Sequence, residues 1–443
     1  MCFVVAGRPK MDPKMDVARE YGVRVIGAIG TVPFGRMLSR SAVVIDALVG
    51  TGRARALEGH VQEAMFCLAN VRLAQDPPKL VALDLPTGLN PDTGKVDFGA
   101  VSCDFTFALG YPKVGLLNFP GAEHAGELRV LDIGVPPGLK EESEVQLELL
   151  DRSWVAGHLP KRPLGSHKGT FGHVLVVAGS RNYVGAAYLA SQASVRAGAG
   201  LTTLATPECV YPIAAAKSTE PIHLPLPDDD EGRVSAQAAQ GLHDRSRRFT
   251  NIVAGCGLGV SDGTVKFVEE LLFNQESSGL SALPVLVDAD GLNNLARIED
   301  WPERRRGPMT LTPHPGEMAT LTGLSTPEVQ ADRVAVAREY ASRWNVTLVL
   351  KGANTVIAEP DGTVRVASFA NPGMASGGTG DVLSGIIGGL MAQGLAPAVA
   401  ASCGVYLHGE AGRQVVSRLG YAGLAASDLL LEIPVAARRV RDS

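Results

Sequence analysis

The chain has 443 residues, of which 45% are hydrophobic and 20% are charged, as in ordinary globular proteins. This composition excludes a disordered chain, and the length predicts two or three domains. The net charge of −5 excludes a strongly basic protein, so we expect no nucleic-acid partner.

The cysteines and the apolar runs predict a cytoplasmic protein with no membrane association. The six cysteines stand apart, without a Cys-x-x-Cys or Cys/His metal spacing, as in reduced proteins. The first apolar run is too short for a signal peptide. The segment 382–408 lacks Asp, Glu, Lys and Arg and is long enough to span a bilayer. Gln393-Gly394 and Pro397 divide it, so we expect two buried helices instead.

Short apolar runs that end in Asp, Gly or Lys alternate with helical patterns along the chain. Such runs are typical of buried parallel strands with helices on both faces of the sheet, which predicts an α/β fold. The expected strands are 42–46 (AVVID), 80–84 (LVALD), 173–179 (HVLVVAG), 251–255 (NIVAG), 284–288 (PVLVD) and 347–351 (TLVLK).

This pattern is interrupted in the middle of the chain. Residues 134–168 are rich in proline and charge, and we place a linker at 139–160 between domains at 1–138 and 161–443. The charged segment 226–248 is expected to form a surface loop and helix.

The most informative motif is the glycine-rich run 371–381 (NPGMASGGTGD), which leads into an apolar helix. Small residues let the backbone approach a ligand closely, and the free N–H groups of a helix start can hold phosphate oxygens. An acid at this place, Asp381, could take a proton from an attacking hydroxyl while phosphate is transferred. The alternative is a flexible loop in which Asp381 is only a helix cap.

This run resembles the anion-hole motif of the ribokinase-like superfamily, whose Gly-x-Gly-Asp places a catalytic aspartate. Further motifs follow one another in order: 167–172 (HKGTFG), 176–179 (VVAG), 185–186 (GA), 196–200 (RAGAG), 255–259 (GCGLG), 288–291 (DADG), 312–317 (TPHPGE) and 351–355 (KGANT). Together they resemble the dehydratase domain of the NAD(P)H-hydrate repair family (YjeF carbohydrate-kinase-like) over about residues 160–440. The resemblance implies a ribokinase-like α/β domain.

The resemblance also implies a reaction. Members of the family use ADP, or ATP in eukaryotes, to dehydrate the damaged cofactors NADHX and NADPHX; here we favour ADP. Phosphorylation turns the ring hydroxyl into a leaving group that the ring nitrogen can expel. Asp381 would activate the hydroxyl, and phosphoryl transfer from ADP implies Mg²⁺, although no ligand set is evident.

The family's binding residues carry over by motif. Adenine-nucleotide contacts fall on Lys351, Gly352, Ala353, Asn354, Thr355, Gly378, Thr379 and Gly380. Hydrate contacts fall on Ala186, Gly257, His314 and Asp381. Alternative structural roles exist: a strand-end turn with a solvated lysine at 351, and a helix-start histidine at 314 with Glu317 as first-turn acid. Asp288 and Asp290 end a strand, where α/β ligands bind, but could equally form a turn.

The first half resembles the epimerase domain of the same family, a Rossmann-like fold. Its motifs are 42–52 (AVVIDALVGTG), 80–89 (LVALDLPTGL), 113–116 (KVGL) and 130–134 (VLDIG). By motif, Asp46 and Thr87 would be potassium ligands, and Asp84 an acid/base residue that contacts the hydrate. Further hydrate contacts would be Gly50, Thr51, Gly52, Arg53, Ala54, Arg55 and Ala56. Isolated strand-end aspartates are, however, often structural.

The family's Asn-Asn-Gly-Gly-Asp-Gly loop, which binds pyrophosphate, does not occur in this sequence. We therefore expect an incomplete, N-terminally truncated epimerase domain with impaired activity. A start codon assigned too far downstream would give the same sequence, and an oligomer partner could restore part of the site.

Two other functions are compatible with parts of the sequence. One is a ribokinase-like kinase of a small alcohol, such as a hydroxymethylpyrimidine, which the GGTGD run alone would allow. The other is a nucleotide-binding module without catalysis, which the presence of Asp381 argues against. The apolar content is compatible with a homo-oligomer.

Overall fold

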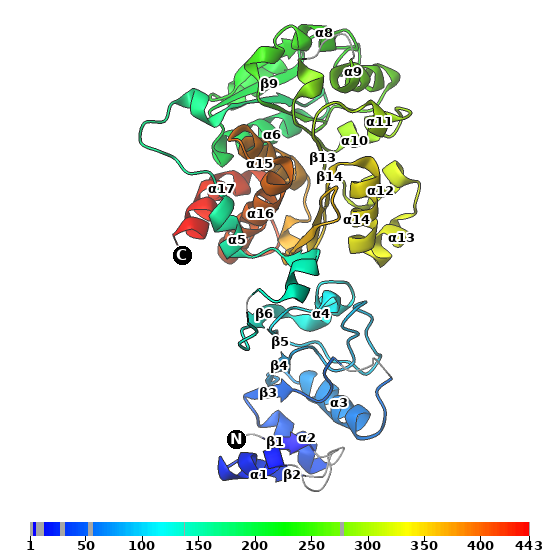
Figure 1. Ribbon diagram of the computed structural model, residues 1–443, viewed down its shortest axis with the longest axis vertical. Coiled ribbons are helices and arrows are strands. Elements are labelled where there is room, and N and C mark those ends of the chain that lie inside the picture. Colours follow the sequence, from blue (N-terminus) through cyan, green and yellow to red (C-terminus); the bar gives the residue numbers. More distant parts are fainter. Residues whose placement is uncertain are drawn as a thin grey trace. The chain divides into compact units, whose positions relative to one another are not determined.

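The computed structural model describes residues 3–5, 13–26, 32–51, 56–136, 138–274 and 279–442. The chain divides into two compact units, Met1–Glu144 (unit 1) and Val145–Ser443 (unit 2). Figure 1 labels their elements. Within the described ranges, no helix has the length and apolar character needed to cross a membrane.

Unit 1 contains two parallel sheets. The smaller pairs β1 (Phe3–Val5) with β2 (Arg24–Ile26), and the larger has the order β3-β4-β5-β6. The larger sheet contains β3 (Val43–Asp46), β4 (Lys79–Leu83), β5 (Phe105–Leu109) and β6 (Glu127–Leu131). The helices are α1 (Pro13–Glu20), α2 (Val32–Ser39), α3 (Gly59–Arg72) and α4 (Gly121–Ala125), with short 3-10 helices η1 (Val114–Leu116) and η2 (Lys140–Glu144).

The apolar pattern of the first half explains this packing. Leu80 and Ala82 alternate with more exposed neighbours along β4 and are fully buried. They lie in one cluster with Met65 and Leu68 of α3, so this helix covers one face of the sheet. The strands predicted at 42–46 and 80–84 are confirmed as β3 and β4.

Unit 2 is built on a ten-stranded sheet of order β10-β9-β8-β11-β12-β13-β14-β15-β16-β7. Neighbours from β10 to β14 are parallel, whereas β14, β15 and β16 are antiparallel. The strands are β7 (Leu147–Leu149), β8 (His173–Val177), β9 (Leu201–Pro207), β10 (Ile222–Leu226), β11 (Asn251–Ala254), β12 (Val285–Val287), β13 (Met309–Leu311), β14 (Thr347–Leu350), β15 (Thr355–Ala358) and β16 (Val364–Ala367). The four strands predicted in this half are therefore confirmed.

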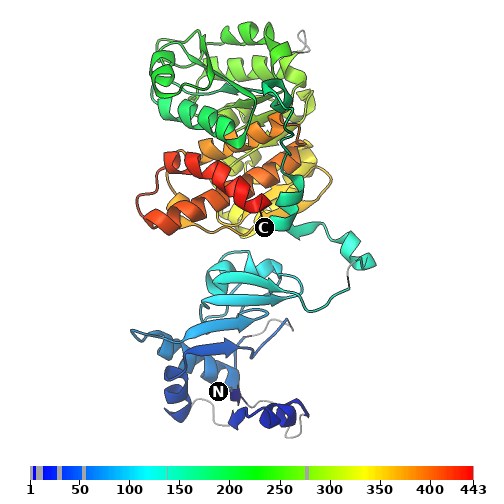
Figure 2. The same ribbon diagram turned by 90° about the vertical axis from the view of Figure 1, so that its left-hand side faces the viewer.

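Helices cover both faces of this sheet (Figures 1 and 2). One layer contains α5 (Arg152–His158), α6 (Val184–Ala197), α15 (Thr379–Ala392), α16 (Pro397–Leu419) and α17 (Ala426–Arg441). Toward the other face lie α8 (Ala238–His243), α9 (Asp262–Phe273), α10 (Asp290–Leu295), α11 (Trp301–Arg304), α12 (Pro315–Thr322), α13 (Thr326–Ala331) and α14 (Arg333–Trp344). Helix α7 (Tyr211–Lys217) connects β9 to β10, and the 3-10 helices are η3 (Lys168–Phe171), η4 (Ser246–Arg248), η5 (Leu280–Ala282) and η6 (Pro372–Met374).

The apolar segment 382–408 forms parts of α15 and α16, as predicted, and both helices are largely buried. Helix α15 packs on α6 at backbone contact. A Cβ atom on Gly385 would lie 2.2 Å from the carbonyl oxygen of Ala190, and one on Gly389 would lie 2.6 Å from that of Ser194. Glycine is required at these places because any side chain would separate the two helices, and this contact fixes where α15 begins.

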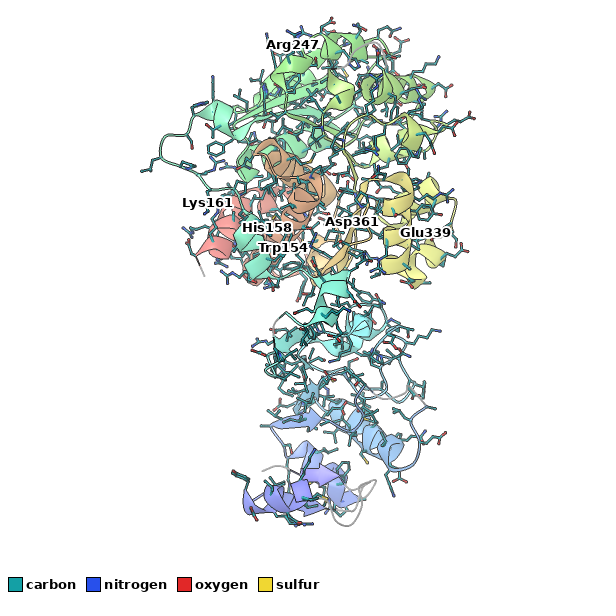
Figure 3. All side chains as sticks on the ribbon, viewed as in Figure 1. Trp154, His158, Lys161, Arg247, Glu339 and Asp361 are labelled. Carbon is teal, nitrogen blue, oxygen red and sulfur yellow. The ribbon has the colours of Figure 1, made fainter. Side chains whose placement is uncertain are left out.

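The linker predicted at 139–160 differs from the observed boundary. The ten-stranded sheet includes β7, which pairs with β16, and Val155 of α5 is fully buried. Trp154 and His158, which Figure 3 labels, stack with ring centroids 4.0 Å apart. The guanidinium of Arg365 lies over the Trp154 ring, 4.7 Å from its centroid. Residues 147–158 thus belong to unit 2. The sequence did not predict this, because a three-residue strand and a two-turn helix are too short to give a recognisable pattern.

Candidate functional site

The candidate site lies at the carboxyl ends of the parallel strands of unit 2. Asp288 follows β12, His314 and Glu317 follow β13, and Lys351 follows β14. The Lys351 ammonium lies 2.6 Å from Oδ1 of Asp288 and 3.6 Å from Oε2 of Glu317. Parallel strands thus bring together residues that are more than sixty positions apart in the sequence.

The glycine-rich run brings the first turn of α15 to this cluster. Gly378 has a positive φ of 92°, and the helix begins at Thr379. Ser384 donates a hydrogen bond of 2.7 Å to Oδ2 of Asp288. A Cβ atom on Gly380 would lie 3.5 Å from the Lys351 ammonium, so the helix start and the lysine are close neighbours. First-turn N–H groups have no acceptor within the helix and can therefore receive phosphate oxygens.

Asp381 has the properties of a general base. Burial, together with the negative charge of Asp288, raises the pKa of Asp381 to about 6. A base with a pKa in this range is ionised at neutral pH but binds a proton more readily than an ordinary aspartate. The raised pKa also shows that the fold buries a carboxylate that would be more stable in water. Such strongly shifted pKa values are common at functional sites.

Lys351 and Cys256 complete the electrostatic environment. Burial lowers the pKa of Lys351, but the carboxylates of Asp288 and Glu317 outweigh this effect, so its pKa is raised and the ammonium stays charged. Burial raises the pKa of Cys256 well above its usual value, with Asp381 and Asp288 adding to the effect. Cys256 is therefore a protonated thiol.

One group of potential metal ligands is present among the described residues. Ligand atoms of Cys256, Asp288 and Asp381 all lie within 4.8 Å of one another. The group does not fit Mg²⁺ well, because Mg²⁺ prefers oxygen ligands, the thiol is protonated, and the Lys351 ammonium already neutralises Asp288. The chemistry of this group is that of an ion pair beside a base.

His314 caps helix α12 with a defined tautomer. Its Nδ1 accepts hydrogen bonds from the backbone N–H groups of Gly316 (3.0 Å) and Glu317 (3.2 Å), while Glu317 accepts from the His314 N–H at 2.7 Å. An accepting Nδ1 leaves the proton of the neutral ring on Nε2. The side chain is 57% exposed, and its Nε2 lies 3.5 Å from Oε1 of Glu317, which is too long for a strong hydrogen bond, so this donor can reach a ligand. The structural role considered for His314 and the binding role are thus compatible.

The loop 351–355 continues from Lys351 into β15. The Lys351 N–H donates to the Pro313 carbonyl at 2.8 Å, which ties this loop to the segment that contains His314. Gly352 has a φ of 146°, and Asn354 has a φ of 53°. The Thr355 hydroxyl donates to the Gly352 carbonyl at 2.9 Å. Residues 351–355, five of the eight residues predicted to contact the nucleotide, thus form one compact turn.

Two of the residues predicted to contact the hydrate, Ala186 and Gly257, lie where the strand order reverses. Strands β8 and β11 are neighbours, and the chain runs outward from them in opposite directions, which is where α/β sheets bind ligands. A Cβ atom on Gly257 would lie 2.6 Å from Cβ of Tyr183 and 2.9 Å from Cβ of Ala186. Gly257 and Ala186 therefore lie together.

Sequence reasoning missed several contributors. Ser384 stands one turn after Asp381 on α15, so its position could have been inferred from helical spacing. No pattern in the sequence indicates that Cys256, within the GCGLG motif, or Arg333, at the start of α14, contributes to this site. Asp290 is structural in this arrangement, since it accepts a 2.9 Å hydrogen bond from the Gly259 N–H.

In unit 1, Asp46 and Thr87 form a buried pair. The Thr87 hydroxyl donates to Oδ1 of Asp46 at 2.6 Å, and the Thr87 N–H donates to Oδ2 at 2.8 Å. Burial raises the pKa of Asp46, since its hydrogen bonds compensate only part of the desolvation. Among the described residues, Asp46 has no salt-bridge partner. A carboxylate and a hydroxyl are hard oxygen donors of the kind that suits an alkali cation.

Unlike Asp46, Asp84 is held by a salt bridge. It has a positive φ of 74°, and its carboxylate forms a salt bridge with Lys113 and accepts from the Leu109 N–H at 3.0 Å. Gly50, Thr51 and Ala56 are exposed, whereas Gly52, Arg53, Ala54 and Arg55 lie outside the described residues.

Comparison with known proteins agrees with this geometry. A sequence model described as NAD(P)H-hydrate dehydratase matches residues 174–435, and one described as YjeF-related protein N-terminus matches residues 6–115. An ADP/ATP-dependent NAD(P)H-hydrate dehydratase from Bacillus subtilis, co-crystallised with ATP and Mg²⁺, superposes with a TM-score of 0.57 at 31% identity. The superposition covers 66% of this chain and 98% of that one.

Longer relatives match both units. The bifunctional NAD(P)H-hydrate repair enzyme Nnr of Moorella thermoacetica is 41% identical over 400 residues, covering 90% of this chain and 73% of the relative. The enzyme of the same name from Thermofilum pendens is 37% identical, covering 99% of this chain and 81% of the relative. Unit 2 therefore has the fold of a ribokinase-like superfamily protein from Enterococcus faecalis, with a TM-score of 0.57 at 24% identity over 67% of this chain and 98% of that one. The chain belongs to the NAD(P)H-hydrate repair enzyme family, and the ribokinase-like fold and family inferred from its motifs are confirmed.

Proposed function

We propose that this chain dehydrates hydrated NAD(P)H with ADP as the phosphoryl donor, or with ATP as in the Bacillus subtilis relative. The observation that carries the proposal is the meeting of Asp381 at the start of α15 with the Lys351–Asp288 ion pair. It places a base, a cation and free helix N–H groups at one point, which is what transfer of a phosphoryl group to a hydroxyl needs.

In the proposed reaction, Asp381 accepts the proton of the ring hydroxyl as the hydroxyl oxygen attacks the terminal phosphorus of the nucleotide. The bond from that phosphorus to the bridging oxygen breaks, so AMP leaves when ADP is the donor. N–H groups at Gly378–Gly380 and the Lys351 ammonium stabilise the charge on the transferring phosphoryl group. The original bond between the ring carbon and the hydroxyl oxygen then breaks, and phosphate leaves with its bonding electrons while the electron pair of the ring nitrogen forms a C=N bond to that carbon. Loss of a proton from the adjacent carbon restores the double bond of NAD(P)H.

The other side chains would orient the two substrates. The Nε2–H of His314 and the small residues Ala186 and Gly257 would receive the hydrate, and the loop 351–355 would receive the nucleotide. Mg²⁺ bound with the nucleotide would supply positive charge against the phosphate groups. Ser384 would hold Asp288 in place beside Lys351.

The test is phosphate release from ADP that depends on added NADHX or NADPHX, together with recovery of the absorbance of the reduced nicotinamide. We expect both signals to appear in equal amounts, since one phosphate leaves for each molecule repaired. Phosphorylation of a small alcohol such as hydroxymethylpyrimidine, with no repair of the hydrate, would overturn the proposal.

We expect the repair rate to depend on pH through Asp381. Because the base must be ionised and its pKa is about 6, kcat/KM should be level above this value and decline below it. The decline should approach about tenfold per pH unit, as for a single essential base. A profile that stays level down to pH 4.5 would mean that Asp381 does not act as the base.

For unit 1 we propose a potassium site at Asp46 and Thr87, supported by the buried carboxylate, which has no salt-bridge partner within the described ranges. Asp84 would act as the acid/base residue and would have to separate from Lys113 to do so. Since the printed sequence has no Asn-Asn-Gly-Gly-Asp-Gly run, we propose that a protein of these 443 residues epimerises the hydrate slowly. The repair assay started with the R form of the hydrate measures this rate directly.

Two further expectations concern the location of the protein and its association with itself. The five described cysteines form no disulfide, which supports a reducing, cytoplasmic location. Val43 and Ile45 on β3 are 54% and 62% exposed, which is in keeping with the predicted self-association.

A further inference from the structure

Arg333, the first residue of α14, extends its side chain beneath the loop 351–355. One terminal nitrogen donates to the Ala353 carbonyl at 2.5 Å, and the other donates to the carbonyls of Leu350 (2.8 Å) and Lys351 (3.1 Å). A single guanidinium thus holds three carbonyl groups of one turn.

The loop is shaped around this guanidinium. Gly352 has a φ of 146°, a conformation that side chains rarely adopt. A Cβ atom there would lie 2.9 Å from a terminal nitrogen of Arg333. Glycine is therefore needed at position 352 both for the backbone conformation and for the close approach of the arginine.

In the described part of the chain, the guanidinium of Arg333 faces carbonyl groups rather than carboxylates. Burial lowers its pKa to about 10, so the guanidinium is still charged at neutral pH. Among the described salt bridges none includes Arg333, and its buried Nε has no acceptor there. Burying a cation against carbonyl groups alone costs stability, and such a cost is usually kept for a functional reason.

The contacts with Arg333 determine which way the backbone groups of the loop point. With three carbonyls turned toward Arg333, the N–H groups of Gly352 and Ala353 are left without a protein acceptor in the described part of the chain. These N–H groups and the buried positive charge together suit an anionic group. The carbonyl of Lys351 is fixed as well, which helps to hold its ammonium at Asp288.

We propose that Arg333 is a positioning residue for the nucleoside diphosphate: it holds the loop 351–355 in the conformation that binds the nucleotide. The inference rests on the proposed nucleotide site at this loop. Arg333 acts through the loop backbone and does not itself take part in phosphoryl transfer.

The experiment compares Arg333→Gln and Arg333→Lys with Arg338→Gln, a matched control on the same helix. Arg338 also donates to a carbonyl, that of Gly362 at 3.1 Å, but in the hairpin between β15 and β16. Figure 3 labels its sequence neighbour Glu339 and, in that hairpin, Asp361. KM for ADP, KM for the hydrate, kcat and the ADP-induced rise in Tm are measured for each variant.

We expect Arg333→Gln to raise KM for ADP about tenfold, the equivalent of about 1.4 kcal/mol of binding, and to reduce the ADP-induced rise in Tm. KM for the hydrate should stay within about twofold, and Arg338→Gln should match the wild type. Arg333→Lys keeps the charge without the fork of donors, so its KM for ADP should lie between those of the wild type and Arg333→Gln.

Gly352→Ala separates this inference from the nucleotide site itself. If Gly352→Ala raises KM for ADP and the Arg333 variants do not, the inference about Arg333 is wrong and the nucleotide site stands. If neither changes KM for ADP, the nucleotide does not bind at this loop. Should Arg333→Gln fail to fold, Arg333→Lys decides, and a wild-type KM for ADP in that variant overturns the inference.

Discussion

Replacing Asp381 with asparagine is expected to stop repair and at the same time to stabilise the protein. Loss of the base should lower kcat by about 10²–10⁴-fold, with nucleotide binding largely retained. Because burial raises the pKa of Asp381 to about 6, above its value in the unfolded chain, the folded state holds its proton more tightly. The stability of the fold therefore falls as the pH rises from about 4 through 6, and asparagine should recover up to about 3 kcal/mol at pH 7.

The measurement is urea unfolding of wild type and Asp381→Asn at pH 7 and pH 4.5, beside the repair assay. The stability gain should be clear at pH 7 and much smaller at pH 4.5, where the wild-type carboxyl is mostly protonated. Asp361→Asn, in the exposed hairpin turn, is the control and should change neither property. Wild-type turnover in Asp381→Asn would show that another group is the base, and reduced stability at pH 7 would contradict the burial argument.

Much of the site could be predicted because parallel strands end at one edge of a sheet. Asp288, His314 and Lys351 each follow an apolar run, so recognising the runs as parallel strands already places these residues near one another. The glycine-rich run could also be recognised, because glycines and an acid at the start of a helix are typical of a phosphate-binding site.

Other parts could not be predicted, for physical reasons. The ion pair of Lys351 with Asp288 depends on which strands are neighbours, and local patterns do not contain the strand order. Arg333 contacts the loop 351–355 from α14, which also contains Arg338 and Arg343. The sequence does not show which of these arginines faces the loop. The hairpin β15–β16 and the edge strand β7 are short, so their pairing is decided by the sheet they join rather than by their own composition.

Replacing Lys351 with methionine is expected to have the largest effect on stability. Asp288 is 1% exposed, and Lys351 is its only partner of opposite charge among the described residues. Without the ammonium, Asp288 is a buried carboxylate held by Ser384 and adjacent to Asp381. Breaking a buried ion pair on one side costs about 3–5 kcal/mol, because the remaining charge is not compensated. Repair should also fail, since the cation that faces the phosphoryl group is gone.

The double variant Lys351→Met/Asp288→Asn tests this explanation. Removing both charges avoids the buried unpaired carboxylate, so the free energy of unfolding should return most of the way to wild type while repair stays absent. Lys79→Met is the control for loss of a lysine salt bridge, because Lys79 is 66% exposed beside Asp104 and should contribute less than about 1 kcal/mol. If the double variant is as unstable as Lys351→Met, the loss comes from packing of the lysine stem, and the ion pair is not what stabilises this edge of the sheet.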